Sequence, residues 1–148
     1  MKVTVVPFEP EHLADMTIQL GQPELDCDRL ARGIALSATG RCFSVLPGSG
    51  GAPLFCGGAL ECHARYASLW AAFSPDAGPA MLAITRRTRH FLTTLKHTRV
   101  DAVVRSDFRA AHRFVHRLGM VAEARLNDYF ENGGDAVVYR AAINRTGK

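Results

Sequence analysis

Apolar and polar residues alternate along this chain with two different periods. Short runs rich in β-branched and aromatic residues are typical of strands, whereas apolar residues that recur every three or four positions lie on one face of a helix. The pattern predicts seven strands and four helices in the order βααβββαβαββ. The predicted strands span residues 2–6, 41–46, 54–63, 67–73, 99–105, 121–126 and 136–142, and the predicted helices span 9–20, 23–39, 80–96 and 107–118.

Each predicted helix has an apolar face and recognisable ends. Pro10, flanked by Glu9 and Glu11, suits the first turn of the first helix, because acids favour the positive helix N-terminus. Asp107 is a predicted N-cap of the last helix, and Gly119 is its C-terminal glycine. The predicted inward stripes are Leu13, Met16 and Leu20; then Cys27, Leu30, Ala31 and Ile34; then Met81, Ile84, Thr88, Phe91 and Leu95, with Leu82 and Leu92 beside them; and last Phe108, Ala111, Phe114, Val115 and Leu118.

The order of the elements predicts an α/β fold. Strands 67–73 and 99–105 are nearly all apolar, as expected for central strands covered on both faces. Mixed alternation of strands and helices implies a mixed central sheet with helices on both faces. A chain of 148 residues without linkers, repeats or low-complexity segments fits a single domain over residues 1–148.

Composition describes a soluble globular protein, since 47% of the residues are apolar and 22% charged. The sequence has neither an apolar run long enough to span a membrane nor the long apolar core of a secretory signal, so we expect a cytoplasmic protein. The net charge is +4. Residues 86–117 hold nine Lys and Arg against two acids, whereas residues 1–28 hold six acids against Lys2. This division suggests an anionic partner for the middle of the chain, either coenzyme A or nucleic acid.

Three residue patterns that often mark sites are incomplete here. The glycine cluster at 47–53 lacks a P-loop lysine and joins two strands, so it is interpreted as a hairpin loop. His112 and His116 have i,i+4 spacing, but no third ligand accompanies them, so no metal site is predicted. The cysteines show no C-x-x-C spacing and are expected to be small core residues: Cys27, Cys42, Cys56 and Cys62.

The segment from Phe114 to Met120 is a basic amphipathic helix stopped by Leu-Gly before a new strand. Together with the order of the elements along nearly the whole chain, it resembles the GNAT superfamily of N-acetyltransferases. The resemblance implies a mixed central sheet splayed between the fourth and fifth strands, acetyl-coenzyme A as cofactor, and a small-molecule or peptide amine as acceptor. It also implies cofactor binding by the fourth strand, the turn after it and the next helix, at Leu69, Ala71, Phe73, Ser74, Gly78, Ala80, Met81 and Arg86.

A narrower resemblance rests on residues 68–70, 83–92, 103–107 and 113–120. These segments look like the GNAT-like proteins of tailed phages and prophages, which tend to have altered cofactor loops. This resemblance leaves open a homo-oligomer or a virion component.

The chain departs from the family pattern where chemistry is expected. The cofactor loop of the family contains Arg/Gln-x-x-Gly-x-Gly/Ala, but here Pro75 replaces the first residue and Pro79 removes an N–H group. Aligning Pro75 with the proline that often ends the strand of the family instead moves Gly78 out of register. Counting back from Gly119, Phe108 and Val115 stand where the family has an Asn and the Tyr that often acts as general acid.

The fourth strand also lacks the glutamate that frequently serves as general base. Glu61 and His63, at the end of the third strand, and Tyr129, near the last hairpin, are therefore weak catalytic candidates. Each has a plain structural alternative, namely a solvent-facing strand end or an amphipathic rim tyrosine. Ser106 and Asp107 lie where the fifth strand ends, and Asp107 is interpreted mainly as a helix cap.

Three functions follow from these observations. The first is an acetyl-coenzyme A-dependent N-acetyltransferase with weak cofactor binding. The second is a catalytically degenerate GNAT-fold phage or prophage protein with a structural or interaction role. The third, nucleic-acid binding through residues 86–117, is disfavoured because aromatic interleaving and a helix-turn-helix signature are missing.

Overall fold

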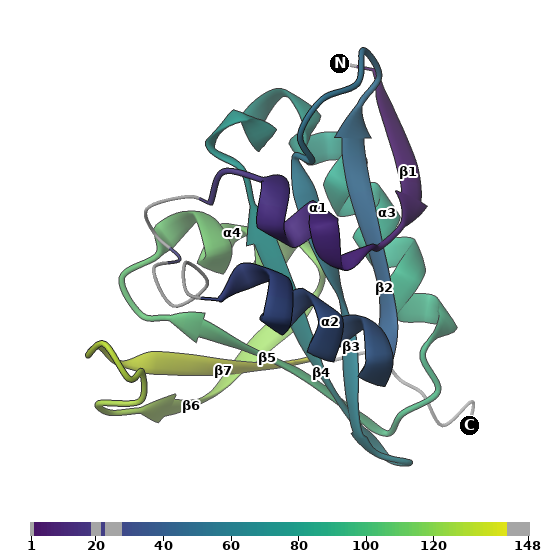
Figure 1. Ribbon diagram of the computed structural model, residues 1–148. Coiled ribbons are helices and arrows are strands. Elements are labelled where there is room, and N and C mark those ends of the chain that lie inside the picture. The colour runs from purple at the N-terminus through teal and green to yellow at the C-terminus, as the bar shows by residue number, and fades with distance from the viewer. Residues whose placement is uncertain (1, 19–21, 23–27, 142–148) are drawn as a thin grey trace. The chain divides into compact units, whose positions relative to one another are not determined.

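The computed structural model describes residues 2–18, 22 and 28–141. It confirms the predicted order of strands and helices and adds one short 3-10 helix, η2, before the third helix (Figure 1). The strands are β1 (Val3–Pro7), β2 (Gly40–Pro47), β3 (Phe55–His63), β4 (Tyr66–Phe73), β5 (Arg99–Arg105), β6 (Met120–Leu126) and β7 (Ala136–Ala141). The helices are α1 (Pro10–Asp15), α2 (Arg29–Thr39), η2 (Pro75–Ala80), α3 (Met81–Thr94) and α4 (Arg109–Arg117).

The strands form a mixed sheet in the order β1-β2-β3-β4-β5-β7-β6. The β4–β5 pair is parallel, and its register runs from Tyr66↔Arg99 to Leu69↔Ala102. The β1–β2, β2–β3, β5–β7 and β6–β7 pairs are antiparallel. A parallel pair requires a crossover connection, which α3 supplies between β4 and β5. The α/β class and the mixed sheet predicted from the sequence are therefore confirmed.

Internal contacts divide the chain into two compact units. Unit 1 comprises residues 1–60 and 70–84, and unit 2 comprises residues 61–69 and 85–148. The core of unit 1 contains Phe8, Leu13, Met16, Cys56 and Ala72, all buried. In unit 2, α4 packs on β5 and β6, and its apolar face buries Phe114, Val115 and Leu118 as the helical spacing predicts. Gly119 ends that helix with a φ of +84°, the left-handed conformation that favours glycine there.

Within unit 1, α1 and α2 pack side by side through a glycine (Figure 1). A Cβ added to Gly33 would lie 2.9 Å from the carbonyl oxygen of Pro10, so this contact needs a residue without a side chain. The predicted inward stripe of α2 is wrong for this reason. Leu30 and Ile34 are 47% and 54% exposed, because the face that packs on α1 is the one with Gly33. Cys27, also predicted in that stripe, lies outside the described residues.

Several helix ends differ from the prediction. α1 stops at Asp15 because Met16 adopts an extended conformation; residues 16–18 are not helical, and Leu20 lies outside the described residues. α2 begins at Arg29, directly after Asp28 with its positive φ of 48°. The predicted cap Asp107 is wrong, since Phe108 occupies the N-cap of α4 and makes no side-chain cap bond.

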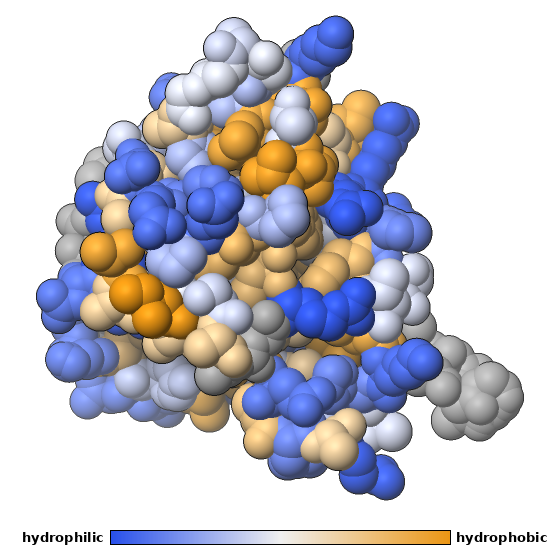
Figure 2. All heavy atoms as spheres, turned by 45° about the vertical axis from the view of Figure 1, so that its right-hand side comes forward, coloured by the Kyte–Doolittle hydropathy of each residue, from blue (hydrophilic) through white to orange (hydrophobic). Residues whose placement is uncertain are grey.

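Figure 2 shows apolar atoms open to solvent in separate groups among hydrophilic side chains on the face it displays. The exposed large apolar residues include Leu82, which was predicted beside the inner stripe of α3 and is 65% exposed. Ile84, Phe91, Leu92 and Leu95 are buried as predicted. Within the described part of the chain, no helix is both long and apolar enough to cross a membrane.

Candidate functional site

The end of β4 carries a side-chain amide on its backbone. The Nε2 group of Gln22 donates to the carbonyl oxygen of Ala71 over 2.8 Å, and the N–H group of Phe73 donates to Oε1 of Gln22 over 2.9 Å. Gln22 is only 7% exposed. One primary amide thus satisfies two backbone groups two residues apart, the pattern by which a neighbouring strand would pair with this edge.

The opposite edge of the same segment faces β3. The N–H group of Ser74 donates to the carbonyl oxygen of Leu54 over 2.9 Å. Because backbone groups of successive residues in a strand point to opposite edges, this bond places Phe73 N–H on the other side, where Gln22 lies. The register of β4 with β5 ends at Leu69. Ala71 and Phe73, both predicted cofactor residues, therefore lie in the part of β4 beyond its pairing with β5, and their backbone groups on this edge bind Gln22.

The turn after β4 is a 3-10 helix whose first amide groups are absent or engaged. Pro75 has no N–H group, and Asp76 N–H donates to Oγ of Ser74 over 3.1 Å. Ala77 N–H donates to the carbonyl oxygen of Ser74, also over 3.1 Å. An anion at a helix start normally binds such free N–H groups. The segment expected to hold a pyrophosphate therefore offers few donors, and the exposed Asp76 adds negative charge.

The remaining predicted cofactor residues have mixed surroundings. Gly78 is exposed, and an added Cβ would meet no atom within 4 Å, so the fold itself does not require glycine there. Ala80 is buried at the end of η2, and Met81 is half-buried at the first position of α3. Arg86 is exposed on α3, as are Arg87 and Arg89. These three exposed arginines give this helix a basic surface, within the positively charged stretch 86–117 noted in the sequence.

Glu61 and His63 lie at the end of β3, beside the two-residue turn that leads into the first residue of β4. Oε1 of Glu61 is 2.7 Å from Nε2 of His97. Nδ1 of His63 accepts a hydrogen bond from the backbone N–H of Arg65 over 3.1 Å. Both candidates thus lie near the start of β4, whereas the amide-binding edge is at the end of that strand.

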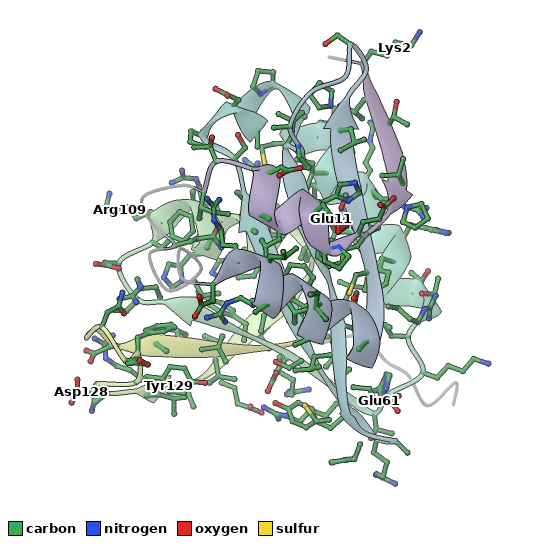
Figure 3. All side chains as sticks on the ribbon, viewed as in Figure 1. Lys2, Glu11, Glu61, Arg109, Asp128 and Tyr129 are labelled. Carbon is green, nitrogen blue, oxygen red and sulfur yellow. The ribbon has the colours of Figure 1, made fainter. Side chains whose placement is uncertain are left out.

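Tyr129 is the third weak catalytic candidate, and it lies in the loop between β6 and β7. Its side chain is 51% exposed, and its ring packs edge-on against Phe130 with centroids 5.1 Å apart. Figure 3 shows Glu61 and Tyr129, both in unit 2, well apart on different elements. These two candidates do not come together in one site.

α4 carries a histidine that binds a buried tyrosine. Nε2 of His112 lies 2.9 Å from the carbonyl oxygen of Ser106, and Nδ1 lies 2.6 Å from the hydroxyl group of Tyr139 on β7. His116 packs its ring edge-on against the same tyrosine. Both histidines of the i,i+4 pair thus contact Tyr139. No group of three or more metal-ligating side chains occurs among the described residues.

β5 contains a buried carboxylate, Asp101, which was not predicted because the rest of the strand is largely apolar. Asp101 is 4% exposed, and its Oδ2 accepts from the Tyr66 hydroxyl over 2.9 Å and from Nη2 of Arg99 over 3.1 Å. Arg99 also donates to Glu123 over 2.6 Å, and this bond lowers the pKa of Glu123. Burial, and then the hydrogen bond to Asp101, raise the pKa of Tyr66. The negative charge of Asp101 is paired with the Arg99 guanidinium and the side chain is buried, so Asp101 is not suited to accept a proton from a substrate.

The described cysteines differ in exposure. Burial raises the pKa of the Cys56 thiol to about 12, and burial also raises the pKa of Cys42. Oγ of Ser44 lies 2.8 Å from Nδ1 of His12 and 3.4 Å from Sγ of Cys56. Because Cys56 is buried and protonated, this constellation is not a thiolate nucleophile. The prediction of core cysteines holds for Cys56, but Cys62 is exposed.

The fold has close counterparts among solved structures. A candidate phosphinothricin N-acetyltransferase matches with a TM-score of 0.78 and 9% identity, over 97% of this chain and 99% of that chain. A GNAT superfamily phosphinothricin acetyltransferase from Sinorhizobium meliloti, in complex with acetyl-coenzyme A, matches with a TM-score of 0.70 and 14% identity, over 95% and 88%. A variant spermidine N-acetyltransferase from Vibrio cholerae matches with a TM-score of 0.63 and 19% identity, over 93% and 94%.

These matches show that the chain has the GNAT fold. No protein-family model matches the sequence, and no curated protein matches it. The resemblance to phage proteins gains no support from the matched structures named above.

Sequence reasoning missed Gln22, Tyr139 and Asp101. Gln22 lies between two helices and has no periodic signal, while Tyr139 and Asp101 sit within strands whose patterns are otherwise apolar. Only Asp101 could have been found from the sequence: an acid inside an apolar strand indicates a buried carboxylate, and a buried carboxylate requires partners.

Proposed function

We propose that residues 1–148 form a single-domain acetyl-coenzyme A-dependent N-acetyltransferase. The observation that carries this proposal is the strand edge at Ala71 and Phe73, which binds an amide beyond the registered β4–β5 pair in a chain with the GNAT fold. An edge of this kind suits the extended, amide-bearing arm of coenzyme A. The solved acetyltransferase with bound acetyl-coenzyme A supports the choice of cofactor.

The residues after β4 suit the cofactor only in part. Leu69, Ala71, Phe73 and Ser74 would hold the amide-bearing arm, and Gly78, Ala80, Met81 and Arg86 would lie toward the phosphates. The engaged N–H groups at the start of η2 favour weak phosphate binding. Each missing charge-assisted hydrogen bond costs roughly 1.5–3 kcal/mol, or about tenfold or more in affinity, so we expect a dissociation constant of tens of micromolar or more.

The chemistry would be transfer of an acetyl group to an amine. Bound acetyl-coenzyme A supplies a thioester with a tolerable leaving group, so much of the rate comes from positioning the amine beside it. Backbone N–H groups of β4 would polarise the thioester carbonyl. Glu61 and His63 remain candidate bases and Tyr129 a candidate acid, but Glu61 and Tyr129 lie well apart, so they are alternatives and not partners in one site. The acids Glu9, Glu11 and Asp15, on or next to α1, support a cationic small-molecule or peptide acceptor.

Calorimetric titration with acetyl-coenzyme A tests the proposal, followed by detection of released thiol with a panel of polyamines, amino acids and blocked peptides. Cys62 should first be changed to serine, because its exposed thiol would react with the detecting reagent. We expect saturable binding and amine-dependent thiol release. Absence of binding at millimolar acetyl-coenzyme A would contradict the proposal.

A catalytically degenerate GNAT-fold protein with an interaction role is the alternative. It is favoured by Phe108 and Val115, neither of which can transfer a proton, and by the scarcity of free N–H groups at η2. This alternative predicts cofactor binding without transfer to any amine, or no binding at all. Under either function we propose a cytoplasmic location and no nucleic-acid partner.

A further inference from the structure

The primary amide of Gln22 occupies the positions that a ligand amide would need on β4. Its Nε2 and Oε1 atoms take the Ala71 carbonyl and the Phe73 N–H at normal hydrogen-bond lengths. A secondary amide in an extended chain presents the same two groups, one donor and one acceptor, to a strand edge. Both cannot bind at once, because each backbone group already has its partner in this direction.

From this geometry we infer that Gln22 is an internal competitor for the amide-bearing arm of the acyl donor. This inference rests on the proposed function and adds a regulatory contact to it. Ligand entry requires that Gln22 release Ala71 and Phe73, so the measured affinity is the intrinsic affinity reduced by the fraction of molecules in which the edge is free.

The contact between Gln22 and β4 is buried, specific and uncharged. Gln22 is nearly fully buried, so its two hydrogen bonds form away from competing water. Its amide is uncharged, so release requires no proton and the competition should not depend on pH near neutrality. The effect should be confined to the amide-bearing arm and should spare the nucleotide part of coenzyme A.

The test compares wild-type protein with Gln22→Leu and Gln22→Glu. Leucine removes both hydrogen bonds, whereas glutamate keeps an acceptor for Phe73 N–H but turns an oxygen toward the Ala71 carbonyl. Titrations use pantetheine, which has amides but no nucleotide, and ADP, which has a nucleotide but no amide.

We expect Gln22→Leu to bind pantetheine about tenfold more tightly, the scale of one to two neutral hydrogen bonds. Gln22→Glu should tighten binding less than Gln22→Leu. ADP affinity should be the same in all three proteins. Pantetheine affinity in Gln22→Leu that is equal to or weaker than in wild type would overturn the inference.

If Gln22→Leu does not fold, the wild-type protein provides the test by NMR. Saturating pantetheine should move the side-chain NH₂ signals of Gln22 to a solvent-exposed position and shift the Phe73 amide signal. Unchanged Gln22 signals at saturation would overturn the inference.

The two proposals fail in different ways. Tighter pantetheine binding by Gln22→Leu without acetyl transfer to any amine would remove the proposed function and keep the inference. Acetyl transfer without an effect of Gln22→Leu would keep the function and remove the inference. Absence of pantetheine binding by every variant would overturn the inference, and absence of acetyl-coenzyme A binding as well would overturn the proposed function.

Discussion

The phenol of Tyr139 is hydrogen-bonded to His112 in a way that defines the tautomer of a neutral imidazole. Nε2 of His112 faces the Ser106 carbonyl, which can only accept, so Nε2 carries the proton. Nδ1 is then the acceptor, and the Tyr139 hydroxyl donates to it over 2.6 Å. Burial raises the pKa of Tyr139, which keeps this donor protonated. The pair joins α4 to β7 within unit 2.

Tyr139→Phe should therefore destabilise the protein by about 1–2 kcal/mol, because it removes one hydrogen bond and leaves the acceptor Nδ1 of His112 without its donor. Tyr129→Phe is the matched control, since Tyr129 is half exposed and should change stability by less than about 0.5 kcal/mol. Urea unfolding of the two variants measures the difference. Equal effects of both substitutions would show that the Tyr139 hydroxyl contributes no stability.

Two glycines of unit 1 should respond to alanine in opposite ways. A Cβ at Gly58 would lie 2.2 Å from the Arg41 carbonyl oxygen and 2.7 Å from the Cys42 Cα, so backbone atoms would have to move. Gly58→Ala should cost about 2–4 kcal/mol.

A Cβ at Gly78 would meet no atom within 4 Å, so Gly78→Ala should keep or slightly raise the melting temperature. If the phosphates of coenzyme A approach Gly78 closely, the same variant should bind coenzyme A several-fold more weakly. Thermal unfolding and calorimetry of the two variants check both expectations. A stable Gly58→Ala protein would contradict the first of them.

Asp76 should oppose cofactor binding through its charge. It is exposed in the first turn of η2, where phosphates are expected. Asp76→Asn should tighten coenzyme A binding about two- to threefold at low salt, and the gain should fade as salt screens the charge. The variant should lose a few tenths of a kcal/mol of stability, because an acid favours a helix N-terminus. Asp15→Asn, another exposed acid of unit 1, should leave coenzyme A affinity unchanged.

Arg86 and Arg87 should help to attract an anionic ligand. Both lie exposed on α3, and reversing their charge to glutamate should weaken coenzyme A binding several-fold at low salt, with a smaller loss at high salt. Unchanged coenzyme A affinity together with a steep, salt-dependent loss of nonspecific DNA binding would instead indicate a nucleic-acid surface. No effect on either ligand would show that this helix face serves only solubility.

Stability should fall at alkaline pH through Cys56. Its thiol keeps its proton to a pKa of about 12 in the folded protein, whereas the unfolded chain releases it near pH 9. Between these values the folded state binds more protons, so the free energy of unfolding decreases as pH rises, by on the order of 1 kcal/mol at pH 10. Urea unfolding under reducing conditions should show this slope in wild type and a shallower one in Cys56→Ala. Parallel slopes would assign the alkaline loss to other groups, such as Tyr66 and Tyr139.

Local patterns predicted the elements because their causes are local. The apolar stripe of α4 and the glycine at its end specify that helix without reference to the rest of the chain, and the structure reproduces both. Likewise, the nearly all-apolar runs of β4 and β5 predicted two central strands, and the structure pairs them in parallel. The prolines at 75 and 79 already indicated a weakened phosphate loop, because the lack of an N–H group is a property of the residue itself.

Tertiary structure decided the features that depend on a partner far along the chain. Leu30 and Ile34 have helical spacing, but the face of α2 that packs is set by the close approach of Gly33 to Pro10, more than twenty residues away. Gln22 acquires its role only when β4 lies beside it, and Asp101 is tolerated in a buried strand only because Tyr66 and Arg99 reach it. Spacing along a sequence reports which side chains share a face, whereas a hydrogen bond between distant residues requires the backbone path that only the folded chain supplies.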